Sequence, residues 1–265
     1  MLKLIAQNKY KLMAFIVVLY LLVDVMQHKG QARVLLSKKF PELNTKGLKP
    51  TGKNQLHNKN KNWKKGINTV EKLDDLNAET PGFECDVYFD TATKVFYVHH
   101  DAGKNSGPDL NLLLEQYQQK KLKAGIWLDI KNLDTHNWEP VLNTLLQLQK
   151  KFRLQNKIIV ESGRADLLSA FTDSGFFSSW YVPFFNPYKM NDTENSQRAD
   201  SISSVISKTR VDALSGYYFQ TSFLHYYFPR YPVLTWGDKS EFSIVNLLFQ
   251  RKTAADSSIF IVLKP

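Results

Sequence analysis

The stretch FECDVYFD at residues 83–90, followed by VFYVHHD at residues 95–101, decides the fold that this chain is expected to adopt. Side chains alternate along a strand, so the first stretch places Glu84 and Asp86 together on one face. Two neighbouring carboxylates are costly to bury unless a cation or water lies between them. The second stretch ends in His-His-Asp. A carboxylate pair followed by imidazoles favours metal-assisted acid–base chemistry, and the alternative reading is a solvated strand face.

Strand-like and helix-like segments alternate through the rest of the chain. A helix with Asn68 as its cap is expected at 68–76, and helical apolar spacing is clearest at 138–152. Further strands are expected at 55–57, 125–130, 157–161, 180–184, 211–215, 232–236 and 258–263. With 83–89 they make eight, if 94–99 is a hairpin partner. The sequence therefore predicts an α/β fold, a single (β/α)8 barrel of TIM type.

Polar residues collect at the predicted strand ends, where such barrels carry their chemistry. They are His57, Glu84, Asp86, His100, Asp129, Lys131, Glu161 and Trp236. We expect Glu84, Asp86 and Asp129 to hold one divalent cation, Mg²⁺ or Ca²⁺, because hard cations prefer oxygen ligands. His57 and His100 are the candidate general base and acid for displacement at phosphorus, and Lys131 would stabilise charge on phosphate oxygens.

The charge of the chain is concentrated near its N-terminus. The 265 residues carry a net charge of +10, but residues 1–66 alone have 14 Lys and Arg against 2 Asp and Glu. A basic segment beside an apolar run suggests contact with anionic lipid headgroups, and no nucleic-acid motif accompanies it. The one cysteine, Cys85, excludes an internal disulfide framework.

The N-terminal segment is expected to be a membrane anchor. Residues 1–11 are a basic leader, residues 12–26 are an apolar helix, and residues 27–53 are a basic tether before a barrel at 54–265. The apolar run is short for a span, which needs roughly 20 residues, so a signal anchor and a cleaved signal peptide both stay open. We favour the uncleaved anchor with the barrel outside the cytoplasm, in the periplasm or extracellular space. Cleavage would make the protein secreted.

These motifs resemble the glycerophosphodiester phosphodiesterase and phospholipase-C-like barrel superfamily. The superfamily pairs a first-strand His with E-x-D, V-x-H-D and an acidic-x-Lys, which here read His57, residues 84–86, residues 98–101 and residues 129–131. The segments HNKN at 57–60 and WLDIKN at 127–132 are more similar to the menorin-like branch. The resemblance implies a phosphodiesterase-type barrel whose substrate is not established for the branch. Our main hypothesis is metal-assisted cleavage of a small phosphodiester or a lipid headgroup. Asn58, Asn60, Glu161 and Trp236 are the residues that we expect to join Lys131 in binding substrate.

Two departures from the superfamily pattern keep other functions open. Asn58 stands where the phosphodiesterases usually carry a phosphate-binding Arg, and Asp129 replaces the usual Glu. A catalytically inactive, membrane-tethered binding or scaffolding barrel is therefore the main alternative. A sugar-cleaving barrel that uses two of the acids without a cation is the third possibility. The aromatic runs at 217–219 and 225–228 are expected to belong mainly to the core.

Overall fold

The computed structural model describes residues 2–36, 38–43, 45, 47–52, 54–56, 60–101, 107–237 and 243–264. Its contacts divide the chain into two compact units. Unit 1 combines residues 1–39 with residues 239–256, and unit 2 combines residues 40–238 with residues 257–265.

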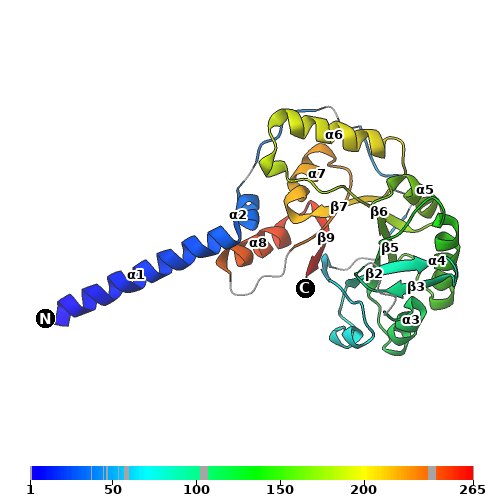
Figure 1. Ribbon diagram of the computed structural model, residues 1–265, viewed down its shortest axis with the longest axis horizontal. Helices are drawn as coiled ribbons and strands as arrows, with labels where there is room; N and C mark the ends of the chain where they lie inside the picture. The colour runs from blue at the N-terminus through cyan, green and yellow to red at the C-terminus, as the bar shows by residue number, and fades with distance from the viewer. Residues whose placement is uncertain are drawn as a thin grey trace. The chain divides into compact units, whose positions relative to one another are not determined.

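Strands β1, β2 and β4 to β9 form a closed parallel barrel, as the sequence predicts (Figure 1). The barrel closes because β1 pairs in parallel with both β9 and β2. Strand β3 pairs antiparallel with β2 and is the predicted hairpin partner. The strands are β1 (Asn62–Lys64), β2 (Gly82–Asp90), β3 (Val95–Val98), β4 (Gly125–Ile130), β5 (Ile158–Ser162), β6 (Phe177–Tyr181), β7 (Ala213–Tyr217), β8 (Val233–Trp236) and β9 (Ile259–Lys264).

Helices connect the strands and cover the outside of the barrel, as Figure 1 shows for α3, α4 and α5. Asp109 caps the first of these by accepting a hydrogen bond from the Asn111 backbone N–H at 2.7 Å. The helical elements of unit 2 are η1 (Glu71–Asp75), α3 (Leu110–Gln119), α4 (Trp138–Phe152), α5 (Ala165–Asp173), η2 (Pro187–Lys189), α6 (Asp192–Ile206), η3 (Tyr218–Gln220) and α7 (Thr221–Tyr227).

Apolar side chains form two layers because successive strand residues point to opposite faces. One cluster fills the space between strands and helices and includes Phe83, Cys85 and Val87 of β2. The other fills the barrel interior and contains Trp63, Trp127, Ile159, Phe177, Ala213, Leu234, Ile261 and Leu263. Its two tryptophans are 1% and 0% exposed, so the interior below the carboxyl ends of the strands is a packed floor.

Glycines make room for the Trp63 ring. Gly82 of β2 and Gly125 of β4 are register partners, and both lie against that indole. A Cβ on Gly82 would lie 2.2 Å from the ring, and one on Gly125 would lie 2.5 Å from it. Both distances are far below van der Waals contact, so the largest interior side chain requires glycine at both positions.

Three predicted elements differ clearly from the observed ones, and β7 begins and ends two residues later than the predicted strand at 211–215. The first strand is β1 at 62–64, whereas residues 55 and 56 of the predicted strand are irregular. Strand β6 begins and ends three residues earlier than the predicted strand at 180–184. The predicted helix at 68–76 is only the short 3-10 helix η1, because the Asn68 side chain bonds Asp86 instead of capping a helix.

The described residues of 40–52, which we assigned to the tether, pack on the barrel unit. Phe40 is 7% exposed, and its ring centroid lies 5.5 Å from that of Phe223. The Tyr227 hydroxyl donates a hydrogen bond to the Pro41 carbonyl at 2.9 Å, and the Thr51 hydroxyl donates to Asp212 at 3.1 Å. This part of the segment is therefore integrated into unit 2.

Unit 1 consists of α1 (Leu2–Gln27), α2 (Lys29–Leu35) and α8 (Ile244–Ala255). Residues 9–27 of α1 are long and apolar enough to cross a membrane, and only 6% of this window is buried. The end of α1 nevertheless contacts α8, because the Asp24 carboxylate accepts a hydrogen bond from the Val245 backbone N–H at 3.0 Å. Gln31 of α2 donates to the Asn246 side chain at 3.2 Å.

Candidate active site

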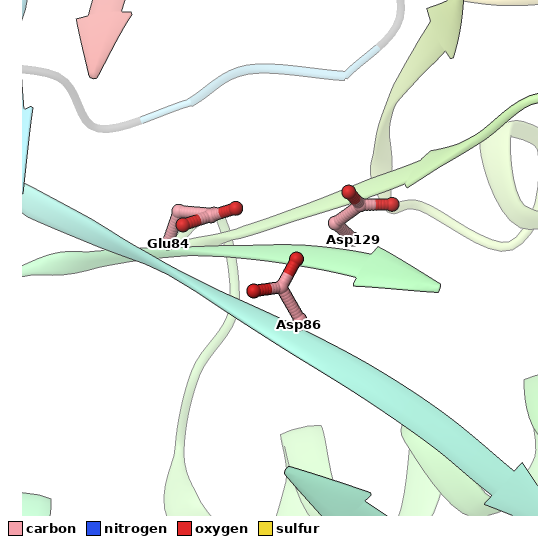
Figure 2. Close-up of side chains that lie close together, drawn as sticks. All are labelled: Glu84, Asp86 and Asp129. Carbon is pink, nitrogen blue, oxygen red and sulfur yellow. The ribbon is translucent and has the colours of Figure 1, made fainter. Parts of the chain in front are cut away.

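Three carboxylates meet at the carboxyl end of the barrel. Glu84 and Asp86 extend from β2 and Asp129 extends from β4, and each offers an oxygen within 4.8 Å of the others. Figure 2 shows the three carboxyl groups turned toward one another. The strand register explains the meeting, because Asp86 and Asp129 are partners on neighbouring parallel strands. The structure thus brings together the three predicted metal ligands.

The loop that follows β1 holds two of these carboxylates in place. The Gly66 backbone N–H donates to Glu84 Oε2 at 2.6 Å. The Asn68 side chain donates to Asp86 Oδ2 at 2.7 Å and accepts a hydrogen bond from the Asp86 backbone N–H at 2.9 Å. In metal sites, hydrogen bonds made to the ligating side chains by neighbouring residues fix the orientation of those ligands. Neither Gly66 nor Asn68 was among the predicted site residues.

Lys131 neutralises part of the acidic cluster. Its ammonium Nζ lies 2.6 Å from Asp86 Oδ1 and also contacts Asp129 Oδ2. The ammonium is partly buried and the two carboxylates raise its pKa, although burial alone would lower it. An ammonium has three donors, and these contacts use two of them. A third donor therefore remains for an oxygen atom of a bound ligand.

Burial makes the acidic cluster unfavourable in its fully ionised form. Loss of solvation and the nearby Asp86 carboxylate raise the pKa of Glu84 to about 8. Burial also raises the pKa of Asp129, against the opposing effect of Lys131. The single positive charge of Lys131 does not balance the negative charges of Glu84, Asp86 and Asp129 when all three are ionised. The site therefore has an excess of negative charge that favours binding of a cation.

Glu161 extends the cluster onto β5. It is the register partner of Asp129 and is 2% exposed. Burial and the Asp129 carboxylate raise its pKa well above the usual range. The Ser215 hydroxyl lies near enough to favour its charged form, but no direct hydrogen bond forms, and Oε2 has no hydrogen-bond partner among the described residues. Glu161 is therefore a buried acid with one unsatisfied oxygen at the site.

A cavity of about 180 Å³ opens at this cluster. It is lined by Lys65, Glu84, Asp86, His100, Asp129, Lys131, Glu161, Tyr181, Trp236 and Leu263. Seven of these were predicted as site residues, and Lys65, Tyr181 and Leu263 were not. Lys65 directly follows β1, so correct placement of the first strand would have identified it. Tyr181 was expected within a strand that in fact ends there.

The two adjacent histidines have different environments. His99 is 8% exposed, and its ring is stacked on Tyr88 with centroids 4.4 Å apart. Its Nδ1 lies 2.9 Å from the Asp101 carbonyl oxygen, so the ring is held within the structure. The His100 side chain is 73% exposed and lines the cavity, with Nδ1 3.3 Å from Asp101 Oδ1. His100 is therefore the histidine available for chemistry here.

The remaining predicted site residues lie elsewhere. His57 and Asn58 fall outside the described residues. Asn60 is exposed and is not part of the described cavity lining. Its side-chain oxygen accepts hydrogen bonds from the backbone N–H and the side-chain amide of Asn62, which forms a local turn before β1.

The donor set fits a hard divalent cation. Ca²⁺ binds oxygens at about 2.3–2.6 Å, so oxygens across it lie about 5 Å apart, and Mg²⁺ requires a somewhat closer set. The oxygens of Glu84, Asp86 and Asp129 lie within 4.8 Å of one another, so the three carboxylates are close enough to hold one such cation. The unsatisfied oxygen of Glu161 and the raised acid pKa values agree with a cluster built around positive charge.

Comparison with solved structures identifies the class of fold. A glycerophosphodiester phosphodiesterase from Parabacteroides distasonis is similar with a TM-score of 0.52 and 14% identity, over 77% of this chain and 93% of its own. A putative one from Galdieria sulphuraria gives a TM-score of 0.53 and 14% identity, over 78% and 94%. No protein-family model and no curated protein sequence matches this chain.

An Oleispira antarctica phosphodiesterase is similar to the same degree. Its TM-score is 0.52 at 12% identity, over 77% of this chain and 92% of its own, and its structure holds the product sn-glycerol-3-phosphate. At 12–14% identity, this structural similarity shows a shared fold and no more. The chain thus has a TIM-barrel fold like that of these glycerophosphodiester phosphodiesterases.

Proposed function

We propose that this protein is a metal-dependent phosphoric diester hydrolase of the glycerophosphodiesterase type. The observation that carries this proposal is the meeting of Glu84, Asp86 and Asp129 within 4.8 Å, beside Lys131, in the cavity of a phosphodiesterase-type barrel. The substrate is expected to be a small phosphodiester or a lipid headgroup. The likeness to the menorin-like branch stays a prediction from the sequence.

The carboxylates and the lysines have complementary roles in this proposal. Glu84, Asp86 and Asp129 would hold Mg²⁺ or Ca²⁺, which supplies positive charge to the phosphoryl oxygens when it is bound. Lys131 offers its third donor to a phosphate oxygen. Lys65, directly after β1, brings a second ammonium to the cavity, where it would contact a phosphate oxygen.

Proton transfer is assigned to histidine. Hydrolysis of a diester needs a base that takes a proton from water and an acid that gives one to the departing alcohol. His100 lines the cavity and carries one of these roles. His57, which lies outside the described residues, is proposed for the other. Glu161 and Trp236, which were predicted as substrate-binding residues, would contact the substrate from the wall of the cavity.

Turnover with and without metal tests the proposal. The full chain, purified in detergent, is assayed with bis(4-nitrophenyl) phosphate and a panel of glycerophosphodiesters, with Mg²⁺ or Ca²⁺ or after chelation. We expect chelation to abolish turnover and Asp129→Asn to lower it about 100-fold or more, because removal of one preorganised electrostatic group costs roughly that much. Asp166→Asn is the control, since Asp166 is an exposed acid that pairs with Arg164.

The outcome also separates the alternative functions. Turnover that survives both chelation and Asp129→Asn would contradict the metal-dependent site. Binding of the cation in calorimetry without turnover of any diester would favour the scaffolding barrel. A sugar-cleaving site that pairs Asp86 with Asp129 is disfavoured, because the Lys131 ammonium contacts both carboxylates.

We further propose that α1 anchors the protein in a membrane, with the barrel outside the cytoplasm. Supporting this, residues 9–27 have a mean hydropathy of 1.7 and are almost entirely exposed. Asp24 and Gln31 bond α8, and the Lys252 ammonium donates to the Val34 carbonyl at 2.7 Å. Cleavage near Ala32 would remove the first two of these contacts, which favours retention of the segment over secretion.

Membrane extraction tests the anchor. The full chain should resist extraction by alkaline carbonate and yield an N-terminal sequence that begins at or near residue 1. A mature N-terminus beyond Ala32, with the protein in the soluble fraction, would overturn the anchor and identify a signal peptide.

A further inference from the structure

The cavity is divided between charged and aromatic sides. Strands β2, β4 and β5 supply the acids and Lys131, whereas the ends of β6 and β8 supply Tyr181 and Trp236. Those two rings lie 5.2 Å apart between centroids. The next three strands around the barrel after β5 are β6, β7 and β8. Of these, β6 and β8 present aromatic rings to the cavity that the acids line.

The aromatic side continues outward from the cavity. The Tyr217 ring lies 5.8 Å from that of Trp236, and the Phe184 ring lies 5.9 Å from that of Tyr217. Phe219 lies beneath this pair, 5.4 Å from Phe184. We call Tyr181, Phe184, Tyr217, Phe219 and Trp236 the aromatic wall. It connects the cavity to solvent without a charged side chain among its members.

Phe184 at the outer end of the wall is 63% exposed, whereas Phe219 is 7% exposed. Full burial of a Phe side chain is worth about 1.5–3 kcal/mol, and Phe184 forgoes most of that stabilisation. A single exposed apolar residue needs no explanation by itself. Here, however, the exposed ring continues a row of rings that begins at a site for phosphate chemistry.

Hydrogen bonds between the strand ends hold the wall in position. The Tyr217 backbone N–H donates to Gln220 Oε1 at 2.8 Å, and Gln220 Nε2 donates to the Pro183 carbonyl at 3.2 Å. Gln220 therefore links Pro183, which precedes Phe184, to Tyr217. The Thr235 hydroxyl donates to the Gly216 carbonyl at 2.8 Å, which fixes the end of β8 to that of β7. An ordered apolar surface of this kind binds ligand at a low entropic cost.

We infer that the aromatic wall binds an apolar alcohol substituent, an alkyl chain or an aryl ring, on one side of the phosphodiester. The inference rests on the proposed function, because it uses the phosphate position at Lys131 and the carboxylates. A diester has two organic substituents, and the one that faces β6 to β8 meets rings instead of hydrogen-bonding groups. The preferred substrate is therefore a diester of one small polar alcohol and one apolar alcohol.

Two synthetic diesters test this assignment with the metal-loaded full chain. Both contain glycerol 3-phosphate, esterified with methanol in one and with octan-1-ol in the other, and release of glycerol 3-phosphate is measured. Each buried methylene is worth up to about 0.8 kcal/mol, so contact of even two or three methylenes with the wall favours the octyl ester about 10-fold or more in kcat/KM.

Substitutions then locate the source of the preference. Phe184→Ala should lower the octyl-to-methyl ratio about 3-fold or more, and Phe184→Leu should keep most of it. Because Phe184 is largely exposed, these changes leave the fold intact. Leu112→Ala removes another exposed apolar side chain, from α3, and should leave both rates and their ratio unchanged.

The outcomes separate this inference from the proposed function. Equal rates for both esters in the wild type would overturn the inference while the hydrolase stands. A preference for glycerophosphocholine over the octyl ester would also overturn it, because the rings would then bind a cation. If no diester is hydrolysed, calorimetric binding decides. Tighter binding of the octyl ester that is lost in Phe184→Ala supports the wall without the hydrolase, and equal binding rejects both.

Discussion

Asp86 and Asp129 are register partners on neighbouring parallel strands, and one ammonium group, that of Lys131, contacts both carboxylates. The lysine comes from the same strand as Asp129, two residues further on, at the point where β4 ends. The motif D-x-K thus supplies both an acid and its counter-ion from one strand. The adjacent strand β2 supplies Glu84 and Asp86, so two neighbouring strands assemble most of the site, to which β5 adds Glu161.

Lys65 is predicted to bind the phosphate of the substrate. Lys65→Ala should raise KM about 10-fold with a smaller change in kcat, if the contact is made equally in the bound substrate and the transition state. Lys64→Ala is the matched control, because Lys64 is exposed and is not part of the described cavity lining. Equal effects of the two substitutions in steady-state kinetics would show that only the local positive charge matters.

Stability without metal should fall as the pH rises. The pKa of Glu84 is raised to about 8, so its contribution to folding is complete below its ordinary value of 4.5 and is lost as the pH rises through 8. The raised pKa values of Asp129 and Glu161 act in the same direction. The melting temperature of the chelated protein should therefore decrease between pH 5 and pH 9, through a loss on the order of 4 kcal/mol from Glu84.

Two further measurements test whether ionisation of the buried acids causes this decrease in melting temperature. Glu84→Gln should flatten the pH dependence, because the uncharged amide does not ionise. Addition of Mg²⁺ or Ca²⁺ should restore the melting temperature most strongly near pH 8, since metal binding requires deprotonated ligands. A wild-type melting temperature that rises with pH in chelator would contradict the buried acidic cluster.

Asn68 is predicted to position a metal ligand. Asn68→Ala removes two hydrogen bonds to Asp86, one to the side chain and one to the backbone N–H. Loss of such a contact typically weakens metal binding 10- to 100-fold. Isothermal titration with Mg²⁺ or Ca²⁺ measures this, and Asn68→Asp, which keeps only an acceptor, should recover less than half of the lost binding energy. Unchanged affinity in Asn68→Ala would remove Asn68 from the site.

Gly82→Ala is predicted to destabilise the barrel. The new Cβ would lie 2.2 Å from the Trp63 ring, which has no free space in the packed interior. Overpacking of this kind costs about 1–3 kcal/mol or more, measured as a lower midpoint in urea. Gly163→Ala is the control, because a Cβ there meets nothing within 4 Å. Equal midpoints for both variants would contradict the described contact with Trp63.

The sequence predicts the barrel and the acidic part of its site because both depend on regular alternation. Strand β2 carries Glu84 and Asp86 on the face opposite Phe83 and Cys85, and the predicted barrel with its hairpin partner β3 is confirmed. The helix at 138–152 is observed with the predicted bounds, because its apolar spacing and its partners are local.

The first strand escaped prediction for a physical reason. Strand β1 is three residues long, and Trp63 is its one apolar residue between Asn62 and Lys64. Its pairing is fixed by β9 and β2, which are distant in sequence. One apolar residue gives no periodicity from which a strand could be predicted. Lys65, which directly follows β1, was therefore missed together with the strand. The wall was missed because Tyr181 and Tyr217 are half-buried rings that meet Trp236 only where the ends of three separate strands come together.

The bond from the Val245 backbone to Asp24 joins residues 221 positions apart, and this has a consequence for biosynthesis. The first helix leaves the ribosome long before its helical partner near the C-terminus has been translated. Docking of α8 is therefore among the final steps of assembly. A prematurely terminated chain would retain α1 and much of the barrel, yet leave the Asp24 carboxylate near the end of α1 without its backbone donor.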